Sequence, residues 1–273
     1  MSGIKELSFA EQSWLFAVLS KICYSDPAQA QPQFEEIGYT KVTFLDNSGS
    51  QGYVLENKNE IIVVCRGTET KEPIDMIQDI KLWYVSEPRV GLVHDGFKTS
   101  ADLLWPTVYD QIQNHKSKPV YFTGHSLGAA MASVMAVRML HDSDMAKPKK
   151  LFTYGSPRAF SFISSCIACS GIEHHRWVNN LDIVTRSPGM LMGYRHFGKL
   201  HYINSWGNVV DKANVFYRER DRIGSWNRAI ADSKLGYIDS HGIDHYISAL
   251  ENYKNGIVSP ERTDFKWGSL GNV

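Results

Sequence analysis

One serine of this chain lies in a sequence setting that suits covalent catalysis. Ser126 stands between two glycines in Gly124-His125-Ser126-Leu127-Gly128, after an apolar run and before a helix-forming one. Strand, G-x-S-x-G and helix form a nucleophile elbow, in which the serine Oγ is exposed above a sheet and the glycines allow strand and helix to approach closely. The same turn points the amide of Leu127 toward a developing oxyanion. The sequence therefore predicts Ser126 as a nucleophile and Leu127 as an oxyanion donor.

A nucleophilic serine needs a base, and the base needs an orienting carboxylate. Among the downstream acids Asp182 is the preferred candidate, because it follows a predicted strand through Trp177 and Val178. It lies in a strand-end turn that Pro188 closes. Functional groups of an α/β sheet gather where strands end, so we expect the Asp182 carboxylate at the same edge as the serine.

Two histidines compete for the role of the base. His245 opens a predicted last helix, from which its ring can reach back over the sheet edge, and it is the preferred candidate. His241, four residues earlier, is its main rival. His196 and His201 follow the aspartate too closely in the chain to be preferred. The expected chain order of serine, acid and histidine fits either candidate.

The composition is that of an ordinary globular protein. The chain has 273 residues, of which 43% are hydrophobic, and no repeat, low-complexity tract or linker divides it. We therefore expect a single α/β domain over residues 1–273. Its 29 basic and 29 acidic residues balance, so no global field attracts nucleic acid or an anionic membrane, although local patches remain possible. No apolar run reaches the ~18 residues that a transmembrane helix requires.

The N-terminal stretch has the spacing of a first helix rather than of a signal peptide. We therefore expect a cytoplasmic protein, or one exported without a cleavable signal peptide. The four cysteines are expected to be reduced. Cys166 and Cys169 form a C-x-x-C, but the histidines that follow are too close for a tetrahedral zinc site, and two thiols on a helix are favoured. No metal site and no cofactor is predicted.

Strand patterns alternate with helical ones along the chain. Helices are expected at 8–25, with a capping box of Ser8 and Glu11, at 97–115, bent or divided at Pro106, and at 127–140 and 244–254. Strands are expected at 42–45, 52–56, 60–65, 120–123, 150–154 and 175–178.

Six motifs together resemble the class 3 lipases, which are fungal-type triacylglycerol hydrolases. They are Cys65-Arg66-Gly67-Thr68, Val93-His94-Asp95-Gly96-Phe97, Gly124-His125-Ser126-Leu127-Gly128, Thr153-Tyr154-Gly155-Ser156-Pro157-Arg158, Asn179-Asn180-Leu181-Asp182 and Asp244-His245-Tyr246. They follow the family's order from about residue 60 to 250. The resemblance implies an α/β-hydrolase fold, with a central, mostly parallel sheet flanked by helices and a short helical lid over about 69–85.

Carried over residue by residue, the resemblance makes Ser126 the nucleophile, Asp182 the orienting acid and His245 the general base. Thr68 and Leu127 would form the oxyanion hole. The implied function is that of a serine carboxylester hydrolase, a lipase that acts on acylglycerols through an acyl-enzyme. Its partner would be a lipid or ester substrate, with the lipid–water interface as one setting, and no nucleic acid.

The motifs do not separate a lipase from a phospholipase A1, a galactolipase, a feruloyl-type esterase or a thioesterase. A lipase-fold binding protein without turnover is the alternative outside enzymes, and the complete set of catalytic residues argues against it. The apolar loop 189–193 is expected to line an acyl groove.

Overall fold

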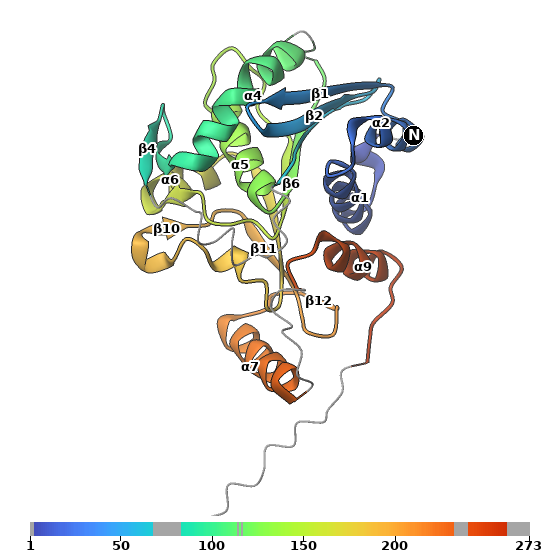
Figure 1. Cartoon of the computed structure of the whole chain (residues 1–273), viewed down its shortest axis with the longest axis vertical. Coiled ribbons are helices and arrows are strands. Elements are labelled where there is room, and N and C mark those ends of the chain that lie inside the picture. Colours follow the sequence, from blue (N-terminus) through green and yellow to red (C-terminus); the bar gives the residue numbers. More distant parts are fainter. Residues whose placement is uncertain (1–2, 68–82, 114, 116, 232–239, 261–273) are drawn as a thin grey trace, which may run out of the picture.

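The computed structural model of the protein describes residues 3–67, 83–113, 115, 117–231 and 240–260 (Figure 1). Their centre is an eight-stranded sheet with the order β1-β2-β3-β6-β7-β9-β11-β12. Strands β3, β6, β7, β9 and β11 are parallel, and antiparallel strands flank them at both edges. The strands are β1 (Lys41–Asn47), β2 (Ser50–Glu56), β3 (Ile61–Cys65), β6 (Val120–His125), β7 (Lys150–Tyr154), β9 (Glu173–Asn179), β11 (Lys199–Ile203) and β12 (Val209–Val210).

Helices cover both faces of this sheet, and each face has its own apolar core (Figure 1). One face packs against α1 (Phe9–Ile22), α2 (Pro27–Ile37) and α9 (Ile243–Lys254). The other packs against α4 (Asp95–Gln113) and α5 (Leu127–Leu140). The predicted mostly parallel sheet between helices is therefore confirmed. None of the described helices is long and apolar enough to cross a bilayer.

A second, four-stranded antiparallel sheet lies beside the main one, with the order β10-β8-β5-β4. Its strands are β4 (Tyr84–Glu87), β5 (Gly91–His94), β8 (Phe160–Ser161) and β10 (Tyr194–Arg195). The remaining elements are the helices α6 (Phe162–Cys169) and α7 (Val215–Ala231) and the 3-10 turns η1 (Ile4–Glu6), η2 (Val184–Arg186) and η3 (Met190–Met192). Strands of two to four residues carry too little periodicity to be predicted.

The predicted elements are present with small shifts of their ends. Helix α1 has the predicted capping box, since Ser8 Oγ accepts from the Glu11 amide at 3.3 Å and the Glu11 carboxylate accepts from the Ser8 amide at 2.7 Å. Helix α4 continues through Pro106 as a single helix, so the chain is not divided there. Cys166 and Cys169 lie on a helix, α6, as predicted, and both are exposed. Residues 68–82, with Thr68 and most of the predicted lid, lie outside the described residues.

A pair of histidines is buried between the main sheet and α1. His175 Nδ1 and His201 Nε2 are 3.0 Å apart on β9 and β11, and the ring of Phe9 lies over both. Because the Glu173 carboxylate accepts from His175 Nε2 at 2.9 Å, His175 Nδ1 is the acceptor and His201 donates. Burial lowers the pKa of His175, and burial together with His175 lowers the pKa of His201 to about 3.

This pair makes stability fall on acidification. The histidine pKa is about 6.5 in the unfolded chain and lower in the folded protein, so the unfolded state binds more protons below that pH. Stability is therefore full above about pH 6.5 and is lost as the pH falls toward the folded pKa. We expect His201→Gln to make the pH dependence of the unfolding free energy shallower by roughly one proton between pH 6 and 4. Denaturant titrations at each pH measure this, with the exposed His245→Gln as the control. Equal slopes in the wild type and His201→Gln would contradict it.

Candidate active site

The predicted elbow is present at the carboxyl end of β6. Ser126 has φ 59° and ψ −131°, a conformation that non-glycine residues rarely adopt and that is found at functional sites. The turn is tight because the start of α5 packs on the end of β3: a Cβ at Gly128 would lie 2.2 Å from the Cys65 carbonyl oxygen. The strained serine and the glycine beside it confirm the predicted turn, but Ser126 is buried and not exposed above the sheet.

A continuous hydrogen-bonded line joins Ser126 to a buried carboxylate. His241 Nε2 lies 2.9 Å from Ser126 Oγ, and His241 Nδ1 lies 3.0 Å from both oxygens of Asp182. Asp182 is fully buried and the other two residues are nearly so. Since an ionised carboxylate only accepts, Nδ1 carries the proton, and Nε2 accepts the serine hydroxyl proton. This order of groups is what a serine nucleophile needs.

The prediction of His245 as the base is wrong in this structure, and its rival His241 takes that place. His245 lies exposed in the first turn of α9. Successive helical residues point about 100° apart, and Tyr246, not His245, belongs to the buried face with Ala249 and Leu250. His241 precedes the helix, and its loop is free of that constraint.

Tyr246 is a residue of the site that sequence reasoning missed. Its hydroxyl donates to Asp182 Oδ2 at 2.6 Å and accepts from the Asn179 amide at 3.1 Å. Burial, together with the Asp182 charge, raises the pKa of Tyr246 well above its usual value, so the phenol stays a donor. The Val184 amide donates to Asp182 Oδ1 at 3.0 Å. A buried tyrosine that needs a partner for its hydroxyl was the available signal.

Gly155 gives the acid and the base room to meet. It follows β7 with φ +59°, in the left-handed region that favours glycine. A Cβ there would lie 2.8 Å from Asp182 Oδ2 and 3.0 Å from the His241 ring. The glycine of the Tyr154-Gly155-Ser156 motif is therefore required by close approach to the relay.

His125, inside the elbow, holds the loop of His241. Its Nε2 lies 2.8 Å from the His241 carbonyl oxygen, which can only accept, so Nε2 is protonated. The Tyr24 hydroxyl then donates to His125 Nδ1 at 3.0 Å. Burial, reinforced by His241, lowers the pKa of His125 well below its usual value and keeps the ring neutral. His125 thus packs and hydrogen-bonds beside the relay without taking part in it.

Of the two predicted oxyanion donors, Leu127 and Thr68, only Leu127 lies among the described residues. Leu127 is the first residue of α5, where backbone N–H groups have no acceptor within the helix. The chain after β3 reaches the serine at Gly67, since a Cβ there would lie 3.3 Å from Ser126 Cβ. Thr68 is the next residue and lies outside the described residues, so its role stays a prediction.

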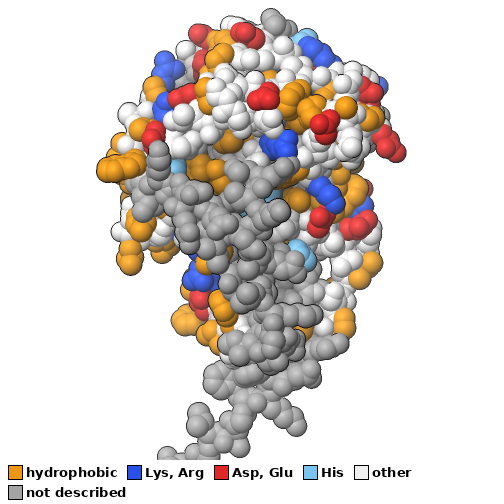
Figure 2. Space-filling view, viewed as in Figure 1, with side chains coloured by type: hydrophobic (Ala, Val, Ile, Leu, Met, Phe, Trp, Pro, Cys, Tyr) orange, Lys and Arg blue, Asp and Glu red, His pale blue; other side chains and the backbone are white. Residues whose placement is uncertain are grey.

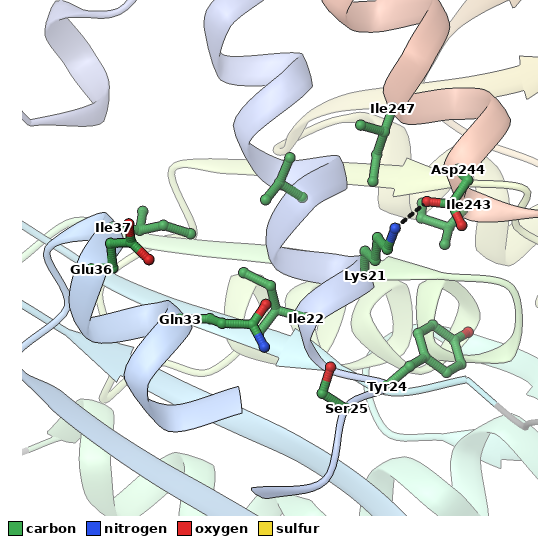
Figure 3. Close-up of a pocket in the computed structure, with 11 residues that line it drawn as sticks. Lys21, Ile22, Tyr24, Ser25, Gln33, Glu36, Ile37, Ile243, Asp244 and Ile247 are labelled. Atoms are coloured by element: carbon green, nitrogen blue, oxygen red, sulfur yellow. Dashed lines mark hydrogen bonds and ion pairs between the residues drawn. The ribbon is translucent and has the colours of Figure 1, made fainter. Parts of the chain in front are cut away.

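A groove of about 630 Å³ lies between α1, α2 and α9 (Figure 3). An ion pair of Lys21 and Asp244 crosses it, and its apolar wall includes Ile22, Ile243 and Ile247. Neither Ser126 nor His241 lines it, so it is not the cleft in which an ester carbonyl would meet the serine.

The apolar loop 189–193 is exposed. Met190, Leu191 and Met192 form η3, and all three side chains are exposed. Their place along an acyl groove stays a prediction.

Residues 62–192 match the family described as Lipase (class 3). This segment of the chain belongs to the class 3 lipase family. Lipase II of Rhizopus niveus superposes with a TM-score of 0.59 and 26% identity, over 72% of this chain and 82% of that one. A triacylglycerol lipase whose catalytic centre is described as a serine protease triad gives 0.61 and 25%, over 71% and 80%. The class 3 lipase chain thus has the α/β-hydrolase fold.

The curated relatives are matched over a smaller share of their own length. Toxin TseL of Vibrio cholerae is 28% identical over 92% of this chain and 44% of its own. A lipase of Rhizomucor miehei is 32% identical over 54% of this chain and 43% of its own. The class 3 lipase chain spans less than half the length of these two relatives.

The choice between the two histidines is directly testable. We expect His241→Asn to lower turnover of a p-nitrophenyl ester by a factor of about 10⁴ or more, because no group remains to take the serine proton. His245→Asn, on the exposed first turn of α9, should keep wild-type turnover. Both proteins should show unchanged circular dichroism. A loss in His245→Asn alone would contradict the structure.

Tyr246→Phe tests the support of the carboxylate. It removes one charge-assisted hydrogen bond to Asp182, and we expect kcat to fall about ten- to a hundredfold with little change in KM. Tyr253→Phe, on the same helix, is the matched control and should match the wild type. Steady-state kinetics on a soluble ester measure this. A change in KM alone would assign Tyr246 to substrate binding instead.

Proposed function

We propose that this class 3 lipase domain hydrolyses carboxylic esters, with acylglycerols as preferred substrates, through an acyl-enzyme on Ser126. The observation that carries the proposal is the buried line from Ser126 Oγ through His241 to Asp182. Each neighbouring pair in that line is at hydrogen-bond distance. Such a line activates an otherwise weak hydroxyl nucleophile.

In the first half-reaction Ser126 Oγ attacks the ester carbonyl while His241 Nε2 takes the hydroxyl proton. The imidazolium then donates that proton to the leaving alcohol as the bond from carbon to the alcohol oxygen breaks. Asp182 holds Nδ1–H and stabilises the positive ring. In the second half-reaction water attacks the acyl-enzyme, and His241 takes its proton and returns it to Ser126.

The tetrahedral intermediate carries its negative charge on the former carbonyl oxygen. The Leu127 amide, at the positive end of α5, is the described group suited to stabilise it, with Thr68 as the second proposed donor. Each such donor contributes about 3 kcal/mol to the transition state.

Acylglycerols are proposed because relatives of this chain carry such names. A secreted mono- and diacylglycerol lipase of Fusarium solani is 30% identical over 44% of this chain, and the Rhizomucor miehei and Rhizopus proteins are named lipases. Phospholipids and short esters are the competing substrates. Rates on triacylglycerol, phosphatidylcholine and p-nitrophenyl butyrate would rank the three classes.

Ser126→Ala is the primary test of the reaction. We expect turnover of p-nitrophenyl butyrate to fall by a factor of about 10⁴ to 10⁶, because the acyl-enzyme can no longer form. A fluorophosphonate probe should label the wild type and not the variant. Unchanged thermal unfolding controls for the fold. Residual turnover near the wild-type level would refute the nucleophile.

A further inference from the structure

One guanidinium group inside the protein has no acceptor in the described part of the chain. Arg176 lies on β9, and its Nε atom is buried without a hydrogen-bond partner. A buried charge is costly unless hydrogen bonds or a counterion stabilise it. Arg176 therefore needs an acceptor that the described side chains do not supply.

Two further arginines lie around Arg176. Burial, together with the charges of Arg158 and Arg218, lowers the pKa of Arg176 to about 9, which means that both cations lie close to it. We call Arg158, Arg176 and Arg218 the arginine cluster. Among the described residues no member of this cluster forms an ion pair with a carboxylate. Three positive charges that repel one another in this way favour a bound anion.

Two neighbouring histidines add no negative charge to the cluster. His196 Nε2 donates to the Thr185 carbonyl at 2.8 Å, and burial together with the Arg176 charge lowers the pKa of His196 well below its usual value. His174 Nε2 and Thr153 Oγ1 are 2.8 Å apart, and His174 Nδ1 is buried without a partner in the described part of the chain. Burial and the Arg176 charge also lower the pKa of His174. Both rings are therefore neutral and leave the positive charge of the cluster uncompensated.

The fold brings the cluster together from three segments. Besides the residue on β9, Arg158 comes from the loop after β7 and donates to the Pro188 carbonyl at 2.7 Å. Arg218 comes from α7, whose Asp221 accepts from the Tyr202 hydroxyl of β11 at 2.9 Å. Figure 2 shows basic and acidic side chains intermixed on the face that it draws. The arginine cluster differs from that surface in having a single sign of charge.

The chemistry of the cluster selects the class of ligand. Guanidinium groups present planar sets of N–H donors that match the oxygens of phosphate and related anions. Residues 157–172 and 183–200, which include Arg158 and the loop that it contacts, contain no Asp or Glu, so no carboxylate of these segments competes for the donors. A divalent tetrahedral oxyanion compensates more of three positive charges than a single carboxylate does.

We propose that the arginine cluster binds a small divalent oxyanion of the phosphate type. The anion bridges β9, the loop after β7 and α7. An anion that binds only the folded protein raises its stability, so its binding is measured as a rise in unfolding temperature. This inference does not rest on the proposed hydrolysis, because the measurement needs no turnover by Ser126.

Thermal unfolding in sodium phosphate and in sodium chloride of equal ionic strength tests the site. We expect phosphate at ten times its Kd to raise the wild-type Tm by about 3–5 °C and to leave the Tm of Arg176→Met unchanged. In chloride, Arg176→Met should unfold at or above the wild-type temperature, because the substitution removes an uncompensated buried charge. Arg220→Met, which removes an exposed arginine of α7, is the matched control and should keep the full rise in phosphate.

Calorimetric titration with inorganic phosphate and with glycerol 3-phosphate distinguishes the sources of the oxyanion. Binding of inorganic phosphate alone assigns the site to the free ion, and tighter binding of glycerol 3-phosphate assigns it to a phosphate ester. Arg218→Met should weaken either ligand by about tenfold and supplies a second variant if Arg176→Met does not fold. No rise of the wild-type Tm in phosphate, an equal rise in Arg176→Met, or an unchanged Kd in Arg218→Met would each overturn the site.

Discussion

A fully buried carboxylate, that of Asp182, is the group on which the rest of the site depends. A buried charge is costly unless hydrogen bonds stabilise it. Here the Val184 amide, the Tyr246 hydroxyl and His241 Nδ1 all donate to it. These donors come from the loop after β9, from α9 and from the loop before α9, so the carboxylate ties three parts of the chain together. Because this carboxylate accepts from His241 Nδ1, it also fixes the orientation and the tautomer of the His241 ring.

The parallel sheet supplies the frame for this arrangement. His125 is paired with Tyr154 across β6 and β7, and Tyr154 with Trp177 across β7 and β9. The chain therefore leaves three neighbouring strands at nearly the same height, just before Ser126, Gly155 and the Asp182 turn. The third member of the relay, His241, comes from the loop before α9. His125 Nε2 holds this loop by donating to the His241 carbonyl.

The same strand ends also lead outward. The loop after β7 passes from Gly155, which touches the relay, to Phe162 on the exposed surface, and the loop after β9 passes from Asp182 to Leu191. Each of these two loops thus runs from the buried polar site to an exposed apolar side chain. The polar groups of the site are stabilised by hydrogen bonds within the protein. The apolar side chains are exposed in the described part of the chain.

The sequence by itself determined the elbow at Ser126, the acid at Asp182 and the positions of the main strands along the chain, because each depends on local features: glycine spacing, strand periodicity and a turn after a strand. It narrowed the base to His241 and His245 but ranked them wrongly. That choice depended on which residue of the last helix faces the core, and Tyr246 takes that position because its hydroxyl finds the buried carboxylate. The sequence likewise did not determine whether the apolar side chains of η3 would be exposed. The identity of an apolar residue does not show whether it lies in a core or on a surface. Only the packing of the other segments around it determines whether it is buried.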